Sequence, residues 1–299
     1  MKDISNQVVF ITGASSGIGA ALAEILAHRY SGVKLILTAR NQAKLATVAS
    51  QCQKLGAEVI VIPADLADSQ QVQNLAQKAV DSFDKIDVLV NNAGYGQMGP
   101  IELVPPTAVQ EQFAVNFYAP LFLSQACIPV MREQGGGRII NISSLAGVMA
   151  FPAAGLYSCS KFALEALSDV LRMELTGFKI RVSIIEFGPV RTNFFQVAWD
   201  KLKVTIPHPE QTIYSPVFTS INSIDTQLEA LGWSAAQAAE VIVKTIQKNN
   251  PPPRIMAATG GNILTFFLNK VFPTWVKDEF WKRFYNIHKV EQQWRRNHS

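Results

Sequence analysis

A tyrosine and a lysine four residues apart are the side chains of this sequence best suited to proton transfer. Leu156-Tyr157-Ser158-Cys159-Ser160-Lys161 begins a helical stretch, so Tyr157 and Lys161 share one face of that helix. A phenol with a pKa of about 10 is a poor base at neutral pH, but a neighbouring ammonium favours the phenolate and lowers that pKa. The pair therefore predicts a general acid–base group, although such pairs also occur by chance on exposed helices.

Two hydroxyls precede this helix, at the end of a predicted buried strand. Asn141-Ile142-Ser143-Ser144 brings them to the carboxyl edge of a sheet, where doubly wound folds bind ligands. A serine there can donate to a developing alkoxide; alternatively it caps a turn or helix. The same residues match a glycosylation sequon, which we discard because the strand is buried and no secretory signal precedes it.

A glycine-rich turn follows the first predicted strand and reads Thr12-Gly13-Ala14-Ser15-Ser16-Gly17-Ile18-Gly19. Glycines allow a tight turn and close approach of the backbone to a pyrophosphate, and a helix N-terminus offers free N–H groups to a phosphate. The spacing GxxxGxG differs from the GxGxxG fingerprint, and the alternative is an ordinary strand–helix connection. Its place at the first strand favours a nucleotide site.

The second predicted strand ends Thr38-Ala39-Arg40-Asn41, without an acidic residue. A carboxylate at this place holds the ribose hydroxyls of NAD, whereas an arginine accommodates the 2′-phosphate of NADP. Arg40 therefore favours NADP(H); the alternative is a solvated arginine at a strand end.

These side chains need elements that position them, and short apolar strands alternate with longer helical stretches along the chain. This alternation predicts an α/β fold with a doubly wound parallel sheet and helices on both faces. The predicted strands are Gln7–Thr12, Lys34–Thr38, Glu58–Pro63, Asp87–Asn91, Arg138–Ser143, Ile180–Glu186 and Arg254–Ala257. The predicted helices are Gly17–Tyr30, Gln42–Leu55, Ser69–Phe83, Ala108–Arg132, Leu156–Thr176 and Ala235–Gln247.

Composition excludes several classes of protein. The 299 residues are 48% hydrophobic and 17% charged, with a net charge of +4, which excludes disorder and does not indicate nucleic-acid binding. Three scattered cysteines predict neither disulfides nor a metal site. No apolar run reaches the roughly 18 residues of a membrane span. We expect a cytoplasmic protein.

The motifs together resemble those of the short-chain dehydrogenases/reductases. To the glycine turn, Asn141–Ser144 and Tyr157–Lys161 they add Asn91-Asn92-Ala93-Gly94 and Gly188-Pro189-Val190-Arg191-Thr192, all in the order typical of that family, from Val8 to about Thr192. The resemblance implies one Rossmann-type domain over residues 1–258 with seven parallel strands. It also implies reversible hydride transfer between a nicotinamide and a carbonyl or alcohol.

The resemblance implies catalytic roles for four residues. Tyr157 is the general acid in reduction, and Ser144, thirteen positions before it, polarises the carbonyl. Lys161 lowers the tyrosine pKa and holds the nicotinamide ribose, while Asn116 supports a proton-relay water. Cys159, often a small residue in the family, is more simply explained by packing.

Cofactor contacts follow from the same resemblance. The pyrophosphate lies on the glycine turn, the 2′-phosphate on Arg40, the adenine on Asp65, the adenosine ribose along the stretch from Asn92, and the carboxamide on the segment after Gly188. The implied residues are Gly13, Ser15, Ser16, Gly17, Ile18, Gly19, Arg40, Asp65, Asn92, Ala93, Gly94, Tyr157, Lys161, Pro189, Val190 and Thr192. Phe187 stands where many members have proline, which leaves the local shape of the nicotinamide end open.

An insertion and an extension bear on the substrate. Phe194–Trp233 has little periodicity, which predicts a lid or binding loop; a pair of short surface helices is the alternative. Its aromatic residues can line an apolar pocket for a bulky hydrophobic ketone or aldehyde, as in the hydroxysteroid-, retinol- and long-chain-ketone-type members it resembles; alternatively they only cover the sheet. The aromatic residues in question are Phe194, Phe195, Trp199, Tyr214 and Phe218.

The segment 259–299 is an aromatic and basic helical extension. Phe280, Phe284 and Ile287 form one helical stripe, and basic residues flank it. Such a helix can lie in a membrane interface; the alternative is packing on the domain or on a neighbouring subunit. The resemblance also implies a homodimer through Ala108–Arg132 and Leu156–Thr176, with a monomer as the alternative.

The sequence therefore predicts an NADPH-dependent carbonyl reductase, reversible as an alcohol dehydrogenase. A non-catalytic dinucleotide sensor or scaffold of the same fold is the main alternative, and a nucleotide-sugar epimerase or dehydratase a third. The complete set of Asn116, Ser144, Tyr157 and Lys161 favours the reductase, and the glycine spacing disfavours the third class.

Overall fold

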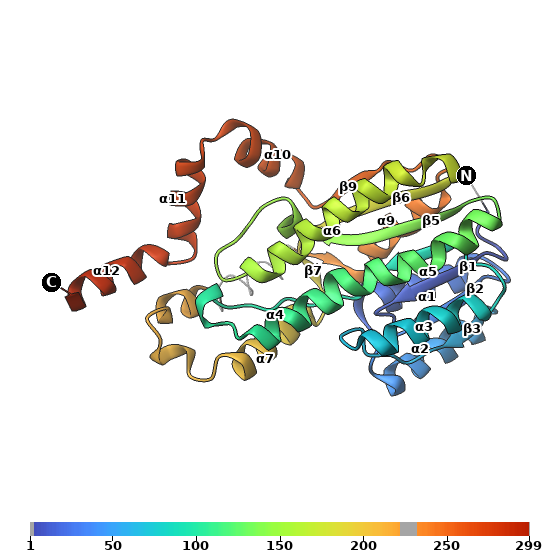
Figure 1. Cartoon of the computed structure of the whole chain (residues 1–299), viewed down its shortest axis with the longest axis horizontal. Coiled ribbons are helices and arrows are strands. Elements are labelled where there is room, and N and C mark those ends of the chain that lie inside the picture. Colours follow the sequence, from blue (N-terminus) through green and yellow to red (C-terminus); the bar gives the residue numbers. More distant parts are fainter. Residues whose placement is uncertain (1–2, 222–231, 299) are drawn as a thin grey trace.

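The central element is a parallel sheet, seen in a computed structural model that describes residues 3–221 and 232–298 (Figure 1). The seven strands have the order β3-β2-β1-β4-β5-β6-β9. They are β1 (Val8–Thr12), β2 (Lys34–Thr38), β3 (Glu58–Val61), β4 (Val88–Asn91), β5 (Gly137–Ser144), β6 (Ile180–Phe187) and β9 (Arg254–Ala257). The order reverses between β1 and β4, which is the point where such sheets bind dinucleotides. The predicted fold class is confirmed.

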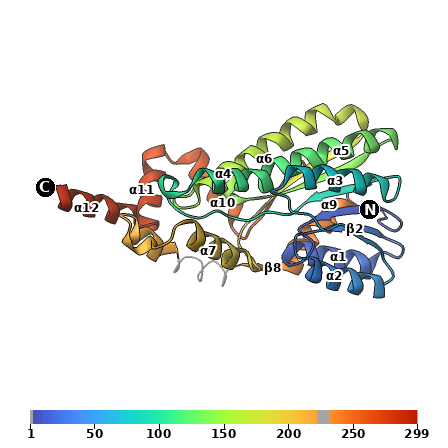
Figure 2. The same ribbon diagram turned by 60° about the horizontal axis from the view of Figure 1, so that its bottom comes forward.

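Helices cover both faces of the sheet (Figures 1 and 2). On one face α1, α2 and α9 share a core with the strands, and on the other α3, α5 and α6 do so. The strands are buried on both faces, which explains their continuous apolar runs. The bounds are α1 (Gly17–Arg29), α2 (Gln42–Lys54), α3 (Ser69–Asp81), α5 (Ala119–Glu133), α6 (Gly155–Glu174) and α9 (Ala235–Gln247).

The predicted helix Ala108–Arg132 is interrupted at its centre. It consists of α4 (Pro106–Phe113), a π-helical turn η2 (Ala114–Tyr118) and α5. By length and composition alone the stretch Pro106–Glu133 could cross a membrane. However, its inner face carries the buried polar residues Gln112, Asn116 and Ser124 and packs on α3 and the sheet, as expected of a core helix.

The insertion after β6 is helical over most of its described part, so the expected irregular loop is wrong there. It contains α7 (Phe194–Thr205), a turn η5 (Pro209–Gln211) and a helix over 215–221; residues 222–231 lie outside the described part. Buried Leu202, Val217 and Phe218 build a third apolar cluster under it. The parallel pair β7 (Val190–Arg191) and β8 (Trp233–Ser234) joins its two ends, so the insertion is anchored as a unit.

The chain ends in a helical extension that projects from the body, beyond the end that carries α4 and α7 (Figures 1 and 2). It comprises α10 (Gly261–Phe266), a π-helical turn η6 (Phe267–Val271), α11 (Thr274–Phe284) and α12 (Ile287–His298). The remaining short helical turns are η1 (Ile101–Leu103), η3 (Leu145–Gly147) and η4 (Thr176–Phe178).

Candidate active site

A groove of about 390 Å³ crosses the carboxyl edge of β1, β2 and β4. It brings together most of the predicted cofactor residues. Those that line it are Gly13, Ser15, Ser16, Gly17, Ile18, Arg40, Asp65, Asn92, Ala93, Gly94 and Thr192. The groove therefore has the position and residues expected of a dinucleotide site.

The glycine turn leaves no room for side chains between β1 and β4. Gly13 has a φ of +68°, and a Cβ on it would lie 2.9 Å from the Cα of Ala93. A Cβ on Gly19 would lie 2.6 Å from Nδ2 of Asn92 and would collide with the Gly13 carbonyl oxygen. Gly19 does not line the groove; it permits the close packing of α1 on the turn.

The first turn of α1 offers its N–H groups to the groove. Ser16, the N-cap residue, makes no side-chain hydrogen bond to the helix backbone. N–H groups left free in this way, at the positive end of a helix dipole, bind anions. The turn therefore fits a pyrophosphate.

Hydrogen bonds join the ends of β1 and β4 beneath this turn. The Thr12 hydroxyl oxygen accepts from the backbone N–H groups of Asn92 and Ala93, each at 3.0 Å. The Asn92 amide donates to the Thr12 carbonyl at 2.8 Å. Asn92 therefore joins the end of β4 to the end of β1 as well as lining the groove. Thr12 is a positioning residue that the sequence reasoning did not single out.

Arg40 is exposed at the groove, and Lys44 lines it too. Neither forms an ion pair with a residue in the described part of the chain. Asn41 caps α2 by accepting from the Lys44 N–H at 2.9 Å, so the helix start carries both cations. Sequence reasoning missed Lys44; its signal was its place in the first turn of a helix, four residues after Arg40.

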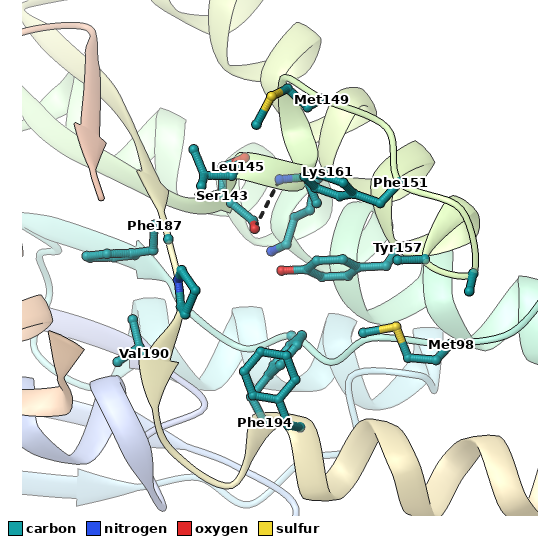
Figure 3. Close-up of a pocket in the computed structure, with 18 of the residues that line it drawn as sticks. Met98, Ser143, Leu145, Met149, Phe151, Tyr157, Lys161, Phe187, Val190 and Phe194 are labelled. Carbon is teal, nitrogen blue, oxygen red and sulfur yellow. Dashed lines mark hydrogen bonds between the residues drawn. The ribbon is translucent and has the colours of Figure 1, made fainter. Parts of the chain in front are cut away.

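A second cavity of about 420 Å³ lies next to the groove and carries the predicted catalytic residues. Ser144, Tyr157 and Lys161 line it, with Tyr157 and Lys161 pointing in from α6 (Figure 3). Ile18, Asn92, Gly94, Thr192 and Phe194 line both cavities. A dinucleotide in the groove would therefore reach the catalytic side chains at this junction.

Lys161 and Asn116 are held by backbone groups. The buried Lys161 ammonium donates to the Ile142 carbonyl at 2.8 Å. Asn116, buried in the π-helical turn, donates to the Tyr95 carbonyl at 3.0 Å and accepts from its N–H at 3.2 Å. A Cβ on Gly94 would lie 3.3 Å from Oδ1 of Asn116 and 3.4 Å from Nζ of Lys161. Asn116 thus lies behind Gly94, near Lys161 but outside the lining of the cavity.

The two serines of β5 have different neighbours. The Ser144 hydroxyl accepts from the Ala146 N–H at 3.2 Å and lies where it lowers the pKa of Tyr157. Ser143 is buried, and its hydroxyl lies where it lowers the pKa of Glu165. Successive side chains of a strand point to opposite faces of the sheet, which explains the difference between the two serines. The geometry therefore favours Ser144 as the partner of Tyr157.

Burial dominates the acidity of the catalytic pair. It raises the pKa of Tyr157 to about 12, an effect that Ser144 only partly offsets. It lowers the pKa of Lys161 to about 8, with the Glu165 carboxylate acting in the opposite direction. Burial is the largest influence on the pKa of Tyr157. The lowering of this pKa by Lys161, whose ammonium lies 5.9 Å from the ring centre, stays a prediction.

A charged cluster lies behind Lys161. Glu165 and Glu186 are buried and both pair with Arg254, which also reaches Asp169 at 2.9 Å. Burial raises the pKa of Glu165 to about 7, while Ser143 and Arg254 lower it. This cluster joins α6 to β6 and β9, and sequence reasoning did not identify it because its members lie far apart in the chain.

The walls of the second cavity are mostly apolar. Phe194 and Phe195 line it as predicted, whereas Trp199, Tyr214 and Phe218 pack in the third cluster instead. The Tyr214 hydroxyl donates to Glu102 at 2.7 Å. The walls that sequence reasoning missed are Met98, Leu145, Met149, Phe151, Ile221, Phe280, Trp281, Phe284 and Tyr285.

The segment after β6 forms the remaining wall. Phe187, Pro189 and Val190 line the second cavity, and Figure 3 shows Phe187 and Val190 across from Tyr157. Phe187 therefore supplies an aromatic surface to this wall of the cavity. Within the described residues, no group of His, Cys, Asp and Glu side chains could hold a metal ion.

Comparison with known proteins gives one consistent family. Residues 7–203 match the short chain dehydrogenase family. The chain is 32% identical over 248 residues to 3-ketodihydrosphingosine reductase of Bacteroides thetaiotaomicron, covering 83% of this chain and 86% of the relative. It is 33% identical over 261 residues to human retinol dehydrogenase 8, covering 83% and 80%.

Solved structures agree with this result. A short chain dehydrogenase/reductase from Burkholderia phymatum in complex with NAD has a TM-score of 0.76 at 26% identity, over 90% of this chain and 94% of that one. A metagenomic short-chain oxidoreductase in complex with NADP has a TM-score of 0.68 at 29% identity, over 86% and 100%.

The raised pKa of Glu165 predicts how stability depends on pH. Between its ordinary value of 4.5 and about 7 the folded chain holds a proton that the unfolded chain has released, so wild-type stability falls as pH rises through this window. Glu165→Gln has no such proton. The difference in free energy of unfolding, wild type minus variant, should fall by about 2 kcal/mol from pH 5 to 7.5 in urea titrations.

The exposed carboxylate Glu174 on the same helix provides the control. Glu174→Gln should leave the difference nearly constant over this range. A difference that stays constant or grows with pH for Glu165→Gln would show that the ion pair with Arg254 outweighs burial.

Proposed function

The chain belongs to the short-chain dehydrogenase family, and we propose that it reduces a bulky hydrophobic ketone or aldehyde with NADPH. One observation carries this proposal. Ser144, Tyr157 and Lys161 line an apolar cavity that shares its edge with a groove bearing Arg40.

In this proposal the chain's own residues manage the proton. Bound NADPH supplies the hydride. A carbonyl oxygen accepts hydrogen bonds from the Ser144 and Tyr157 hydroxyls, and the phenol donates its proton to the developing alkoxide. The phenol of Tyr157 is protonated at neutral pH, as the acid of a reduction must be.

Lys161 and Asn116 support this proton transfer. The ammonium of Lys161 lies beside the phenol and stabilises negative charge that develops on it. Both side chains bind backbone groups through firm hydrogen bonds, so little reorganisation is needed when charge develops. Asn116 is thus a positioning residue in this account.

The preference for NADPH rests on cations and not on the comparisons, whose structures contain either cofactor. Arg40 and Lys44 flank the part of the groove that follows β2. The chain has no acidic residue there to hold a ribose hydroxyl and repel a phosphate. Two cations without ion-pair partners in the described part of the chain fit a 2′-phosphate.

The substrate class rests on the cavity lining. Few polar side-chain atoms other than those of Ser144, Tyr157 and Lys161 face the cavity. Such walls bind lipophilic molecules and orient them by a small number of polar groups. The names of two relatives, a ketodihydrosphingosine reductase and a retinol dehydrogenase, agree with a lipophilic substrate.

A non-catalytic dinucleotide sensor remains the weaker candidate. A sensor would need the groove, but it would not need a serine beside a buried phenol–ammonium pair that lines a second cavity. We also propose a cytoplasmic location, since the three cysteines are unpaired thiols.

We propose a homodimer through α5 and α6. Exposed apolar side chains lie along α6, namely Phe162, Val170 and Met173, the last 61% exposed, and exposed Tyr118 directly precedes α5. Phe162→Glu combined with Met173→Glu should convert a dimer to a monomer in sedimentation velocity. A wild-type chain that sediments as a monomer would contradict this proposal.

Tyr157→Phe should reduce kcat with NADPH by at least about 10³-fold, because the variant has no proton to donate. The NADPH dissociation constant should change by less than about twofold, since Lys161 and the groove remain. Steady-state turnover and fluorescence titration measure the two quantities. Turnover within tenfold of wild type would contradict the assignment of the acid.

Arg40→Asp should raise KM for NADPH by about 10²-fold and leave KM for NADH within about threefold, because the carboxylate repels only the extra phosphate. Kinetics with both cofactors at one ionic strength measure the ratio. Arg191→Asp, at an exposed arginine outside both cavities, is the matched control. An unchanged NADPH/NADH ratio would make Arg40 a mere surface charge.

A further inference from the structure

The net positive charge of the chain lies entirely on its C-terminal extension. Residues 259–299 contain seven of the 27 basic residues and three of the 23 acidic ones. Residues 1–258 contain twenty of each, so this part is neutral and the excess of +4 belongs to the extension. An excess of positive charge confined to one segment of an otherwise neutral chain indicates that this segment binds a negatively charged partner.

The same segment exposes large apolar side chains. Among the described residues, nine of the nineteen exposed large apolar side chains lie there, in about one seventh of the chain; Trp275 is 72% exposed and Ile263 is 66% exposed. The nine are Ile263, Phe266, Phe267, Val271, Phe272, Trp275, Phe280, Phe284 and Trp294. Soluble monomers rarely expose apolar residues at this density without a partner.

The extension contacts the body through part of its surface. Trp281 packs edge-on against Phe151 at a ring distance of 4.9 Å, and Tyr285, Ile287 and Val290 pack on the third cluster. The remaining surface of α10 to α12 projects beyond the body (Figures 1 and 2). The extension is therefore anchored at the cavity and where α10 packs near β9, and large apolar side chains are exposed on the rest of its surface.

Several of its cations have no acidic partner. Glu279 pairs with Arg283 and Glu291 with Lys282. Lys277, Lys289, Arg295 and Arg296 form no ion pair within the described part of the chain. The extension thus presents unpaired positive charge beside exposed tryptophan and phenylalanine side chains, which is the pattern of helices that lie in a lipid interface.

We propose that the C-terminal extension binds the surface of an anionic lipid bilayer, inserting its exposed aromatic side chains among the lipids and placing its free cations at the headgroups. Each cation near such a surface adds to the electrostatic attraction. A second copy of this chain fits less well as the partner, because two extensions in contact would repel each other through their equal positive charge.

This placement has a consequence for the substrate, which rests on the proposed function. Phe280 and Phe284 are exposed on α11 and also line the catalytic cavity. A bilayer against α11 would therefore meet the rim of the cavity, and a lipophilic carbonyl could pass into it with little exposure to water. Binding to the bilayer does not itself depend on this step.

Flotation of the full chain with vesicles tests the proposal. Vesicles of phosphatidylcholine with about one third phosphatidylglycerol should retain the wild-type chain, and retention should fall at least tenfold in pure phosphatidylcholine or at high salt. Wild-type chain that stays in solution with the anionic vesicles at low salt would overturn the proposal.

Variants locate the binding surface. Arg295→Glu with Arg296→Glu, and separately Trp275→Ser with Phe266→Ser, should each reduce retention at least tenfold. The matched controls are Lys179→Glu with Lys248→Glu, exposed cations of the body, and Val204→Ser with Leu55→Ser, exposed apolar residues of the body. Circular dichroism checks the fold of each variant.

The outcomes separate the competing partners. Retention that is equal for extension and control variants would overturn the proposal. Binding of single-stranded RNA without binding of anionic vesicles would also overturn it. The same holds if the extension variants dissociate a dimer but bind vesicles as the wild type does. Tyr157→Phe should float like wild type. If no carbonyl is turned over yet the extension variants alone lose flotation, the proposed function fails and the bilayer proposal stands.

Discussion

The close contact between the carboxyl ends of β1 and β4 determines the rest of this structure. The backbone at Gly13 and Gly19 approaches Asn92 and Ala93 so closely that a Cβ atom would collide with them. The Thr12 hydroxyl accepts hydrogen bonds from the N–H groups of both residues. Because the strand order reverses at this place, the helix that follows β1 and the loop that follows β4 diverge and leave the groove between them. A larger side chain in the turn would fill that groove and separate the two strands.

From this contact the chemistry extends along α6. Lys161 binds the Ile142 carbonyl of β5, and Glu165, one turn further, joins the ion cluster around Arg254. Tyr157 and Lys161 thus lie on a helix whose buried residue Glu165 forms an ion pair with Arg254 of β9. Burial leaves Tyr157 a weak acid and Lys161 a weaker base than usual in water. The neutral phenol is the form that a reduction requires.

The sequence predicted the sheet and most of the site because both depend on local patterns. Short apolar runs gave the strands to within a residue or two. The spacing of Tyr157 and Lys161 placed both on one face of α6. Features that depend on distant contacts were not predictable. The π-helical turn around Asn116, the cluster of Glu165 with Arg254, and the aromatic wall from α11 each join segments far apart in the chain. The insertion resembled a loop because its helices bury few residues each.

The most direct test of the central claim is the oxidation of NADPH and NADH by the purified chain with a panel of carbonyls. The panel should extend from small diketones and aromatic aldehydes to steroid, retinoid and long-chain keto-lipid substrates. The account predicts selective use of NADPH with a bulky lipophilic carbonyl, since the cations of the groove and the apolar walls of the cavity act together. Binding of both nucleotides without turnover of any carbonyl would contradict it and favour a sensor.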